Sequence, residues 1–359
     1  MRQRRRAAGS MRKPAPAPDT RSAATPADEQ PDASLRAFFP RLAALGLGAA
    51  AWSALPALAQ SAPPAAAYGP ASGPEPIGVL FPDIGEPLRK VFTDIIDGIE
   101  DSARQRVRGY PISPNQDVGE LAQVVKRNGT RVVVALGRQG LRAAAGIEAP
   151  LGVVVSGISS LPDGDRHIGI CLTPDPALLF AQLRALAPAL KRVLVVFNPA
   201  NNDWLMRLAR EAARSQGLEL VSHEARDLGH AARLYEAAFA GADGRRDALW
   251  LPTDSTTVDE TTILPLVLRE AWNRNVAIFS SSLLHVKKGA LFALYPNNQE
   301  LGRNLGNLAR SLMAGEHLAR GVTPLRDVFA ALNVRTAGHI GIAVTARTQR
   351  GFHTLYPEA

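Results

Sequence analysis

The sequence predicts an α/β fold in which parallel β-sheets are covered by helices on both faces. Three observations carry this prediction. Short runs of Val, Ile and Leu recur from residue 77 onward, helical segments alternate with these runs, and polar residues gather where the runs end. Continuous apolar runs are typical of strands buried on both faces of a parallel sheet, and their alternation with helices is typical of doubly wound folds. A chain of 359 residues is long enough for two such sheets.

The first units of the chain each combine a strand, a turn and a helix. The run IGVLF at 77–81 leads into the turn PDIGEP and the amphipathic stretch 88–103, and RVVVAL at 131–136 leads into GRQG and LRAAAG. A further helix follows the NPANNDW segment and continues through Gln216. The other runs expected to form strands are 151–156, 167–172, 192–197, 218–223, 247–251, 276–280 and 290–295.

A late amphipathic helix contains two glycines spaced four residues apart, Gly302 and Gly306. Its buried face is marked by Leu301, Leu305, Leu308 and Leu312. In such a helix the glycines indicate close packing against a neighbouring element, not dimerisation within a membrane.

The positive charge of the chain is concentrated at its N-terminus. The formal net charge is +8, but the first 59 residues hold nine of the 41 Lys and Arg and only four of the 33 Asp and Glu. The remainder has 32 basic and 29 acidic residues, a net charge of +3. This balance gives no case for nucleic-acid binding.

The N-terminal region predicts export. Residues 1–35 are rich in Pro, Ala and charge, which indicates disorder, and two arginines then precede the apolar run 42–55 and the small-x-small pattern at 57–59. We expect a signal peptide cleaved near Ala59 and a periplasmic protein that begins with a flexible linker at 60–76. Two alternatives stay open: a retained membrane anchor, and a translation start at Met11 or another later codon. Because no cysteine follows the apolar run, a lipoprotein is not indicated.

Catalytic and metal-binding signatures are missing from the sequence. The single cysteine, Cys171, cannot form an intramolecular disulfide, and the seven histidines lack metal-ligand spacing. We find no G-x-S-x-G elbow, no complete phosphate-binding loop and no H-E-x-x-H motif. These observations predict a protein with no metal and no cofactor that is not an enzyme.

Polar side chains are more frequent at the predicted strand ends than helix capping requires. Capping needs one Ser, Thr, Asp or Asn at each junction, whereas several junctions here have three or more. Ligands of doubly wound sheets bind beyond the carboxyl ends of the strands, so the surplus indicates a site for a polar small molecule. The segments concerned are 83–86, 137–140, 156–160, 198–203, 253–257, 280–282 and 295–298.

The segment DALWLPTDSTTVDET, residues 247–261, is the strongest example, because its apolar strand ends in four hydroxyl side chains and one carboxylate. From the residues alone, Asp254 and Ser255 could belong to a hydrolase, could hold a ligand, or could cap the helix expected after them. A carboxylate at this strand end could pair with the ammonium group of a ligand.

The order of motifs from about Ile77 to about Ile342 resembles the exported substrate-binding proteins of ABC transporters, in the family that includes tryptophan- and tyrosine-binding members. The segments that carry the resemblance are IGVLF…EPLRKVFTDIIDGIED, TRVVVALGRQGLRAA, PALKRVLVVFNPANND, DALWLPTDSTTVDE, VAIFSSSLLHVKKGALFALYPNNQELGRNLGNLARSLMAGE and LNVRTAGHIGI. The strand–PTDST–helix element and the GAL…Y…ELGR element are the most specific of these.

The resemblance implies a type I periplasmic-binding fold with two Rossmann-like lobes, three crossovers and a cleft that closes on a ligand. The lobes are expected at 77–170 with 296–322, and at 171–295 with 323–346, followed by a C-terminal tail at 347–359. The crossovers are expected near 157–172, 290–297 and 320–326. The expected ligand-binding residues are Asp83, Gly137, Arg138, Gln139, Ser156, Asn198, Trp204, Thr253, Asp254, Ser255, Ser281, Tyr295 and Asn297.

This chain departs from the family pattern at three places. Gly137-Arg138 stands where Gly-Thr is usual, Ser280-Ser281-Ser282 stands where an acidic residue is frequent, and the stretch 156–167 is compressed. Arg138 could favour a ligand carboxylate or another anionic group, or could be a solvated arginine at a helix start.

Two function classes follow from the sequence. The first is a monomeric periplasmic receptor that delivers a small polar or aromatic, amino-acid-like ligand to an ABC permease of the inner membrane. The second is an exported sensor or accessory binding protein that uses the same fold to signal to a membrane partner. An enzyme comes third, because the motifs supply no nucleophile–base pair.

Overall fold

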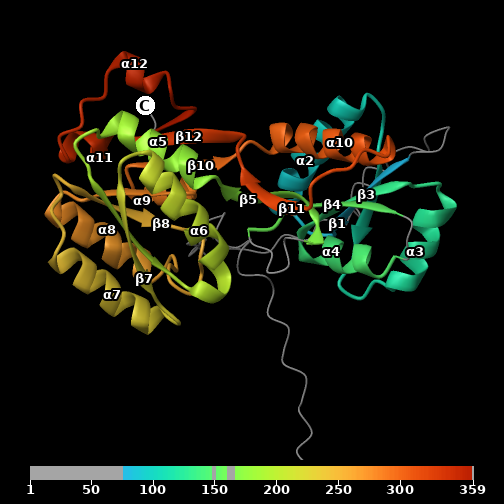
Figure 1. The fold of residues 1–359 in the computed structure, drawn as a ribbon, viewed down its shortest axis with the longest axis horizontal. Coiled ribbons are helices and arrows are strands. Elements are labelled where there is room, and N and C mark those ends of the chain that lie inside the picture. Colours follow the sequence, from blue (N-terminus) through green and yellow to red (C-terminus); the bar gives the residue numbers. More distant parts are fainter. Residues whose placement is uncertain (1–75, 148–150, 160–165, 358–359) are drawn as a thin grey trace, which may run out of the picture. The chain divides into compact units, whose positions relative to one another are not determined.

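The computed structural model describes residues 76–147, 151–159 and 166–357, and it contains two β-sheets flanked by helices (Figure 1). The predicted α/β fold class with mostly parallel sheets is confirmed. The predicted signal peptide at 1–59, and the linker at 60–76 except for Pro76, lie outside the described residues. In the described ranges, no helix has the length and apolar character needed to cross a membrane.

The first sheet has six strands in the order β11-β5-β4-β3-β1-β2, and all its neighbouring strands are parallel. Its strands are β1 Ile77–Pro82, β2 Arg108–Ile112, β3 Val132–Leu136, β4 Gly152–Ser156, β5 Ile168–Pro174 and β11 Gly321–Leu325. Its helices are α2 Leu88–Ala103, α3 Val118–Arg127, α4 Gly137–Ala145 and α10 Asn298–Met313.

Both faces of the first sheet are apolar, because successive residues of a strand point to opposite faces. Val79 and Val134 pack with residues of α2 and α10 on one face. Leu80 and Val133 pack with residues of α3 and α4 on the other. The continuous apolar runs of the sequence thus serve two cores, as expected for a doubly covered parallel sheet.

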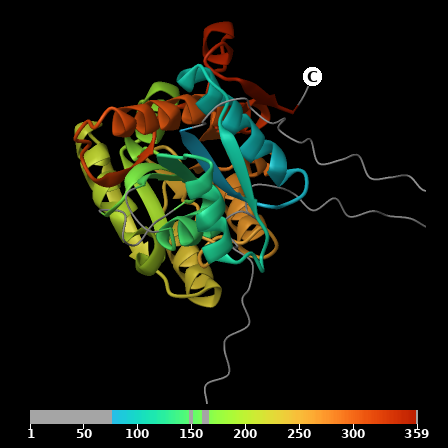
Figure 2. The ribbon, with the colours of Figure 1, turned by 90° about the vertical axis from the view of Figure 1, so that its right-hand side faces the viewer.

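Helices α2 and α10 lie side by side (Figure 1 and Figure 2) and touch through glycines. A Cβ atom added to Gly302 would lie 2.1 Å from the carbonyl oxygen of Ile95 and 2.9 Å from the Cα atom of Gly98. A Cβ atom on Gly306 would lie 2.1 Å from the Ser102 hydroxyl oxygen. The prediction that these glycines serve close helix packing is confirmed.

The second sheet has seven strands in the order β13-β12-β10-β9-β8-β6-β7, and only the pair β10–β12 is antiparallel among its described strands. Its strands are β6 Arg192–Phe197, β7 Glu219–Glu224, β8 Asp247–Leu251, β9 Ala277–Ser280, β10 Phe292–Pro296, β12 Val328–Asn333 and β13 Thr354–Tyr356. Its helices are α5 Pro176–Leu186, α6 Pro199–Ser215, α7 Leu228–Ala240, α8 Ile263–Arg274, α9 Leu283–Lys288, α11 Val334–His339 and α12 Ala346–Gln349.

The core of the second sheet is built around large aromatic side chains. The rings of Trp250 and Phe279 stack with centroids 6.4 Å apart, those of Phe279 and Phe292 stack at 5.2 Å, and Phe180 of α5 meets Trp250 edge-on. Helices α5 and α6 cover this face, and α7 and α8 cover the other. The strands that carry the candidate site are therefore rigidly supported.

The chain passes between the two sheets at three points. The first passage follows β5, the second joins β10 to α10, and the third joins β11 to β12. The last two lie at or next to the predicted crossovers near 290–297 and 320–326. The first lies later than the predicted 157–172, and the predicted lobe boundary at 170 falls inside β5, because β5 stays paired with β4 and β11 and buries Leu172 in the first core.

The C-terminal residues are part of the second sheet. Residues 347–359 were expected to form a tail, but β13 pairs in parallel with β12 and Leu355 packs against the second core. The tail prediction is wrong for the described part of this segment. Leu355 and the buried Tyr356 supply the apolar contacts that bind so short a strand to the sheet.

Candidate functional site

Three loops rich in polar residues meet at one edge of the second sheet. Strand β8 lies between β6 and β9, and all three run in parallel, with Trp250 opposite Val195 and Leu251 opposite Ser280. The residues that follow these strands therefore share the carboxyl edge, which is where ligands bind in such sheets. A cavity of about 20 Å³ lies between the loops that follow β8 and β9.

This cavity brings together some of the predicted residues and adds several that were not predicted. Thr253, Asp254 and Ser255 line it from the β8 loop. Its other lining residues are Leu251, Pro252, Val258, Glu260, Ser280, Ser282 and His285. Glu260, Ser282 and His285 were not among the predicted ligand-binding residues, although all three lie in segments that carry the family resemblance.

The carboxylate of Asp254 is buried, with 5% of the residue exposed, and it accepts five hydrogen bonds from the protein itself. One oxygen accepts from the Asn198 backbone N–H at 2.7 Å and from the Asn202 amide at 3.0 Å. The other accepts from the Asn201 amide at 3.3 Å, and from the backbone N–H and hydroxyl of Thr256 at 3.1 and 2.6 Å. A carboxylate has about four lone-pair sites, so these donors fill its capacity.

Asp254 therefore connects the β8 loop to the start of α6, which begins after Asn198. Its interpretation as the cap of the following helix is contradicted, because α8 begins only at Ile263. The capping carboxylate there is Asp259, which accepts from the backbone N–H groups of Thr261, Thr262 and Ile263.

Asp259 and Glu260 are neighbours whose carboxyl groups have opposite environments. Burial tends to raise the pKa of Asp259, but hydrogen bonds from Thr261, Thr262 and Ile263 outweigh it and hold that pKa well below its usual range. Burial raises the pKa of Glu260, and the charge of Asp259 adds to this, while Lys288 partly offsets it. The ionised form of Glu260 is thus poorly stabilised at the cavity.

Ser280 and His285 form a buried pair in the lining of the cavity. The Ser280 hydroxyl oxygen lies 2.8 Å from His285 Nδ1 and accepts a hydrogen bond from the Ser282 backbone N–H at 2.9 Å. Burial, together with the nearby charge of Lys288, lowers the pKa of the His285 imidazole to about 4, so the ring is neutral at pH 7. Ser280 is fully buried, and its hydroxyl oxygen is engaged by both the His285 ring and the Ser282 backbone.

Two serines at the end of β9 have hydroxyl groups without partners. The hydroxyl oxygens of Ser281 and Ser282 are buried and make no hydrogen bond to the protein, and the same holds for one carboxylate oxygen of Glu260. Buried polar atoms are normally satisfied, so such a concentration of unsatisfied atoms points to a missing partner. Ser281 was predicted as a site residue, whereas Ser282 and Glu260 were not.

Five predicted residues lie at the carboxyl edge of the first sheet. Gly137 starts α4 directly after β3 with a positive φ of 71°, and the buried Gln139 side-chain oxygen has no hydrogen-bond partner. Arg138 is exposed at the same helix start. Asp83 is exposed and pairs with Arg89 at 3.5 Å, and Ser156 is buried and donates to the Ile170 carbonyl at 2.6 Å.

The other four predicted residues have structural contacts of their own. Asn198 caps α6 and Asn297 caps α10. The Trp204 indole donates to the Asn201 carbonyl at 3.2 Å and packs against the second core. The Tyr295 hydroxyl lies 3.0 Å from the hydroxyl of Thr354 in the C-terminal strand.

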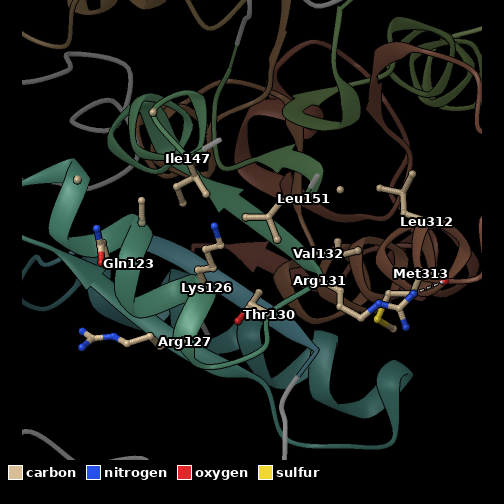
Figure 3. Close-up of a pocket in the computed structure, with 14 residues that line it drawn as sticks. Gln123, Lys126, Arg127, Thr130, Arg131, Val132, Ile147, Leu151, Leu312 and Met313 are labelled. Carbon is tan, nitrogen blue, oxygen red and sulfur yellow. Dashed lines mark hydrogen bonds between the residues drawn. The ribbon is translucent and has the colours of Figure 1, made fainter. Parts of the chain in front are cut away.

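A larger groove of about 990 Å³ lies at the opposite, amino-terminal end of the first sheet (Figure 3). Ile147, Leu151 and Leu312 contribute apolar walls, and the cationic Lys126 and Arg131 lie along it. It contains none of the predicted site residues, and it lies at the strand starts, so it is separate from the candidate ligand site.

The comparisons with known proteins agree with this picture. The model of a family described as ABC transporter substrate binding protein matches residues 179–344, a range that includes the whole carboxyl edge of β6, β8 and β9. The resemblance drawn from the sequence motifs is confirmed by this match. No curated protein matches the sequence.

Solved structures share the fold at low sequence identity. An ABC domain from Streptococcus pneumoniae in complex with L-Trp is 18% identical, with a TM-score of 0.51, and covers 79% of this chain and 100% of its own. The ligand-free, open structure of CD0873, a substrate-binding protein with adhesive properties from Clostridium difficile, is 17% identical, with a TM-score of 0.57, and covers 77% of this chain and 98% of its own. These likenesses confirm the type I periplasmic-binding-like fold.

Proposed function

We propose that this chain is an exported solute-binding protein that captures a small polar or aromatic, amino-acid-like ligand between its lobes and delivers it to an ABC permease of the inner membrane. The observation that carries the proposal is the family match over residues 179–344. The same residues contain the hydroxyl-rich edge of the second sheet, with its cavity and its buried polar atoms that lack partners. The L-Trp complex of the similar ABC domain supports an amino acid as the ligand.

The chemical groups at this edge of the second sheet suit the binding of a ligand. The Ser280–His285 pair is buried, and no group of three or more His, Cys, Asp or Glu suited to a metal ion occurs in the described part of the chain. The side chains lining the cavity offer hydrogen bonds and a carboxylate, which suit ligand binding.

The test is to identify a ligand directly. Mature protein purified without added solutes should release a small molecule that mass spectrometry detects after denaturation. A thermal-shift panel of amino acids and related solutes should then raise the melting temperature for that molecule, because a ligand that binds only the folded state stabilises it. A protein that carries no ligand and responds to no member of the panel would contradict the proposal.

Export is tested separately. Protein isolated from the periplasm should begin near Gln60, whereas an intact N-terminus in the cytoplasm would contradict the proposed localisation. Saturation with the identified ligand should also compact the protein in solution X-ray scattering, because closure of two lobes about a hinge reduces the radius of gyration. An unchanged scattering profile would contradict hinge closure.

A further inference from the structure

The small cavity at the end of β8 and β9 contains polar atoms that the protein does not satisfy. One carboxylate oxygen of Glu260 and the hydroxyl oxygen of Ser282 are buried without hydrogen-bond partners, and both residues line the cavity. A buried polar atom without a partner destabilises the fold, and a charged one does so more strongly. The pair is therefore unfavourable unless another group enters the cavity.

The other polar groups of the cavity are already engaged. Asp254 accepts five hydrogen bonds, and the Ser280 oxygen contacts both the Ser282 backbone and His285. Because Asp254 has no capacity left, Glu260 is the carboxylate of the cavity that remains available for a ligand.

The positive charges near Glu260 do not neutralise it. In the described residues, Glu260 forms no ion pair, and its buried carboxylate oxygen has no hydrogen-bond partner. The charge of Lys288 lowers the pKa of Glu260 but only partly offsets the effect of burial. Lys288 is exposed and donates to the Glu260 backbone carbonyl at 3.4 Å, so its contact is with the main chain. His285 is neutral at pH 7, because burial lowers its pKa to about 4.

The size of the cavity limits what it can accept. The cavity volume of about 20 Å³ exceeds the roughly 10–15 Å³ that is needed to hold one water molecule. An ammonium group is about as large as a water molecule. Its positive charge can pair with the Glu260 carboxylate, and its N–H groups can donate hydrogen bonds to both unsatisfied oxygens.

We infer that this cavity is the subsite for the ammonium group of the ligand, with Glu260 as the counter-charge and Ser282 as a second hydrogen-bond acceptor. The inference rests on the proposed solute-binding function and narrows it to ligands with a primary amine. It also moves the role of ligand anchor from Asp254, which the sequence favoured, to Glu260.

The first experiment needs no ligand. Glu260→Gln removes the negative charge of a carboxylate that has one buried oxygen without a partner, and it keeps the shape of the side chain. The unliganded variant should therefore melt at the same temperature as the wild type or higher at pH 7. Glu224→Gln, which removes an exposed carboxylate at the end of β7, is the matched control and should change the melting temperature little. A lower melting temperature for Glu260→Gln alone would show that its carboxylate supports the fold, and would overturn the inference.

The second experiment uses calorimetry to measure the affinity of the protein for amino acids. Each amino acid is compared with an analogue that has hydrogen in place of the amine, for example L-tryptophan with indole-3-propionate. The wild type should prefer the amine, and Glu260→Gln should weaken amine binding by at least about 30-fold, as expected for removing one partner of a buried charge pair. Affinity for the analogue without the amine should stay the same, and Glu224→Gln should bind like the wild type.

The outcomes separate the two proposals. The ammonium subsite is overturned if the wild type binds solutes but not amines, or if the affinity of Glu260→Gln for the amine lies within twofold of that of the wild type. In either case solute binding stands, and the cavity is occupied by water only. If no solute binds the wild type, the proposed function fails and the inferred subsite fails with it. Retention of amine binding by Asp254→Asn together with its loss in Glu260→Gln would support the reassignment of the anchor.

Discussion

Replacing Asp254 by asparagine should destabilise the protein before any ligand is added. In either orientation of the introduced amide side chain, its NH₂ group replaces one carboxylate oxygen and faces donors instead of accepting from them. In one orientation these donors are the Asn198 backbone N–H and the Asn202 amide, and in the other they include the Asn201 amide and the Thr256 backbone N–H. At least two N–H donors thus lose their acceptor.

The expected magnitude follows from these contacts. An unsatisfied buried donor costs about 1–3 kcal/mol, so two of them cost about 2–6 kcal/mol, and rotation of a neighbouring amide can recover part of this. We expect a loss of about 2–4 kcal/mol in the free energy of unfolding. In a chain of this size that corresponds to a drop of roughly 5–10 °C in the melting temperature.

The assay is thermal unfolding of the unliganded protein followed by circular dichroism. Asp227→Asn is the control, because Asp227 caps α7 by accepting from the His230 N–H at 2.7 Å, and Asn caps a helix about as well as Asp. The control should unfold within about 0.5 kcal/mol of the wild type. If Asp254→Asn also melts within about 1 °C of the wild type, the hydrogen-bond count does not describe its role.

Three further predictions concern other parts of the fold. Gly302→Ala should destabilise the protein by about 3 kcal/mol or more in denaturant titration, because its Cβ atom would lie 2.1 Å from the Ile95 carbonyl oxygen. Gly338→Ala is the control, because the space around Gly338 is open. Equal losses of stability in the two variants would contradict the proposed close packing at Gly302. Cys171 is 1% exposed, and burial raises its pKa to about 11. A thiol reagent at pH 8 should therefore modify it only after the protein unfolds, and rapid reaction of the native protein would refute this prediction. The hydrogen bonds that lower the pKa of Asp259 stabilise the fold while this carboxylate is ionised, so their contribution is complete above the ordinary pKa of 3.8 and declines as the pH falls towards the folded-state pKa. Asp259→Asn should therefore be less stable than the wild type at pH 7. A difference in the free energy of unfolding that does not narrow below about pH 4 would contradict this prediction.

The strands of the two sheets were largely predictable because their signal is local. The run 247–251 coincides with β8, and the stretch 88–103 coincides with α2, since each has a continuous apolar or amphipathic pattern bounded by turn residues. Strand β2 was not predicted, because RGYPI contains a proline and a glycine and only alternate residues are buried. Strand β13 was not predicted either, because three residues form a strand only when a partner such as β12 is present.

The candidate site was predictable only in outline. The sequence placed Thr253, Asp254, Ser255 and Ser281 at strand ends, and the structure brings their loops to one edge of the second sheet. The sequence could not predict which polar atoms remain free to bind a ligand, because this depends on hydrogen-bond donors from distant segments of the chain. Asp254 receives hydrogen bonds from residues more than 50 positions away.

The sequence by itself determined the α/β class, most strand positions and the close packing at Gly302, because periodicity and residue size act over a few neighbouring positions. The tertiary structure alone decided that Asp254 is saturated, that Glu260 has an oxygen without a partner, and that β5 stays in the first sheet to Pro174. The physical reason is the same for all three. Hydrogen-bond satisfaction and strand pairing are properties of groups that folding brings together from remote parts of the chain, and no local pattern records them.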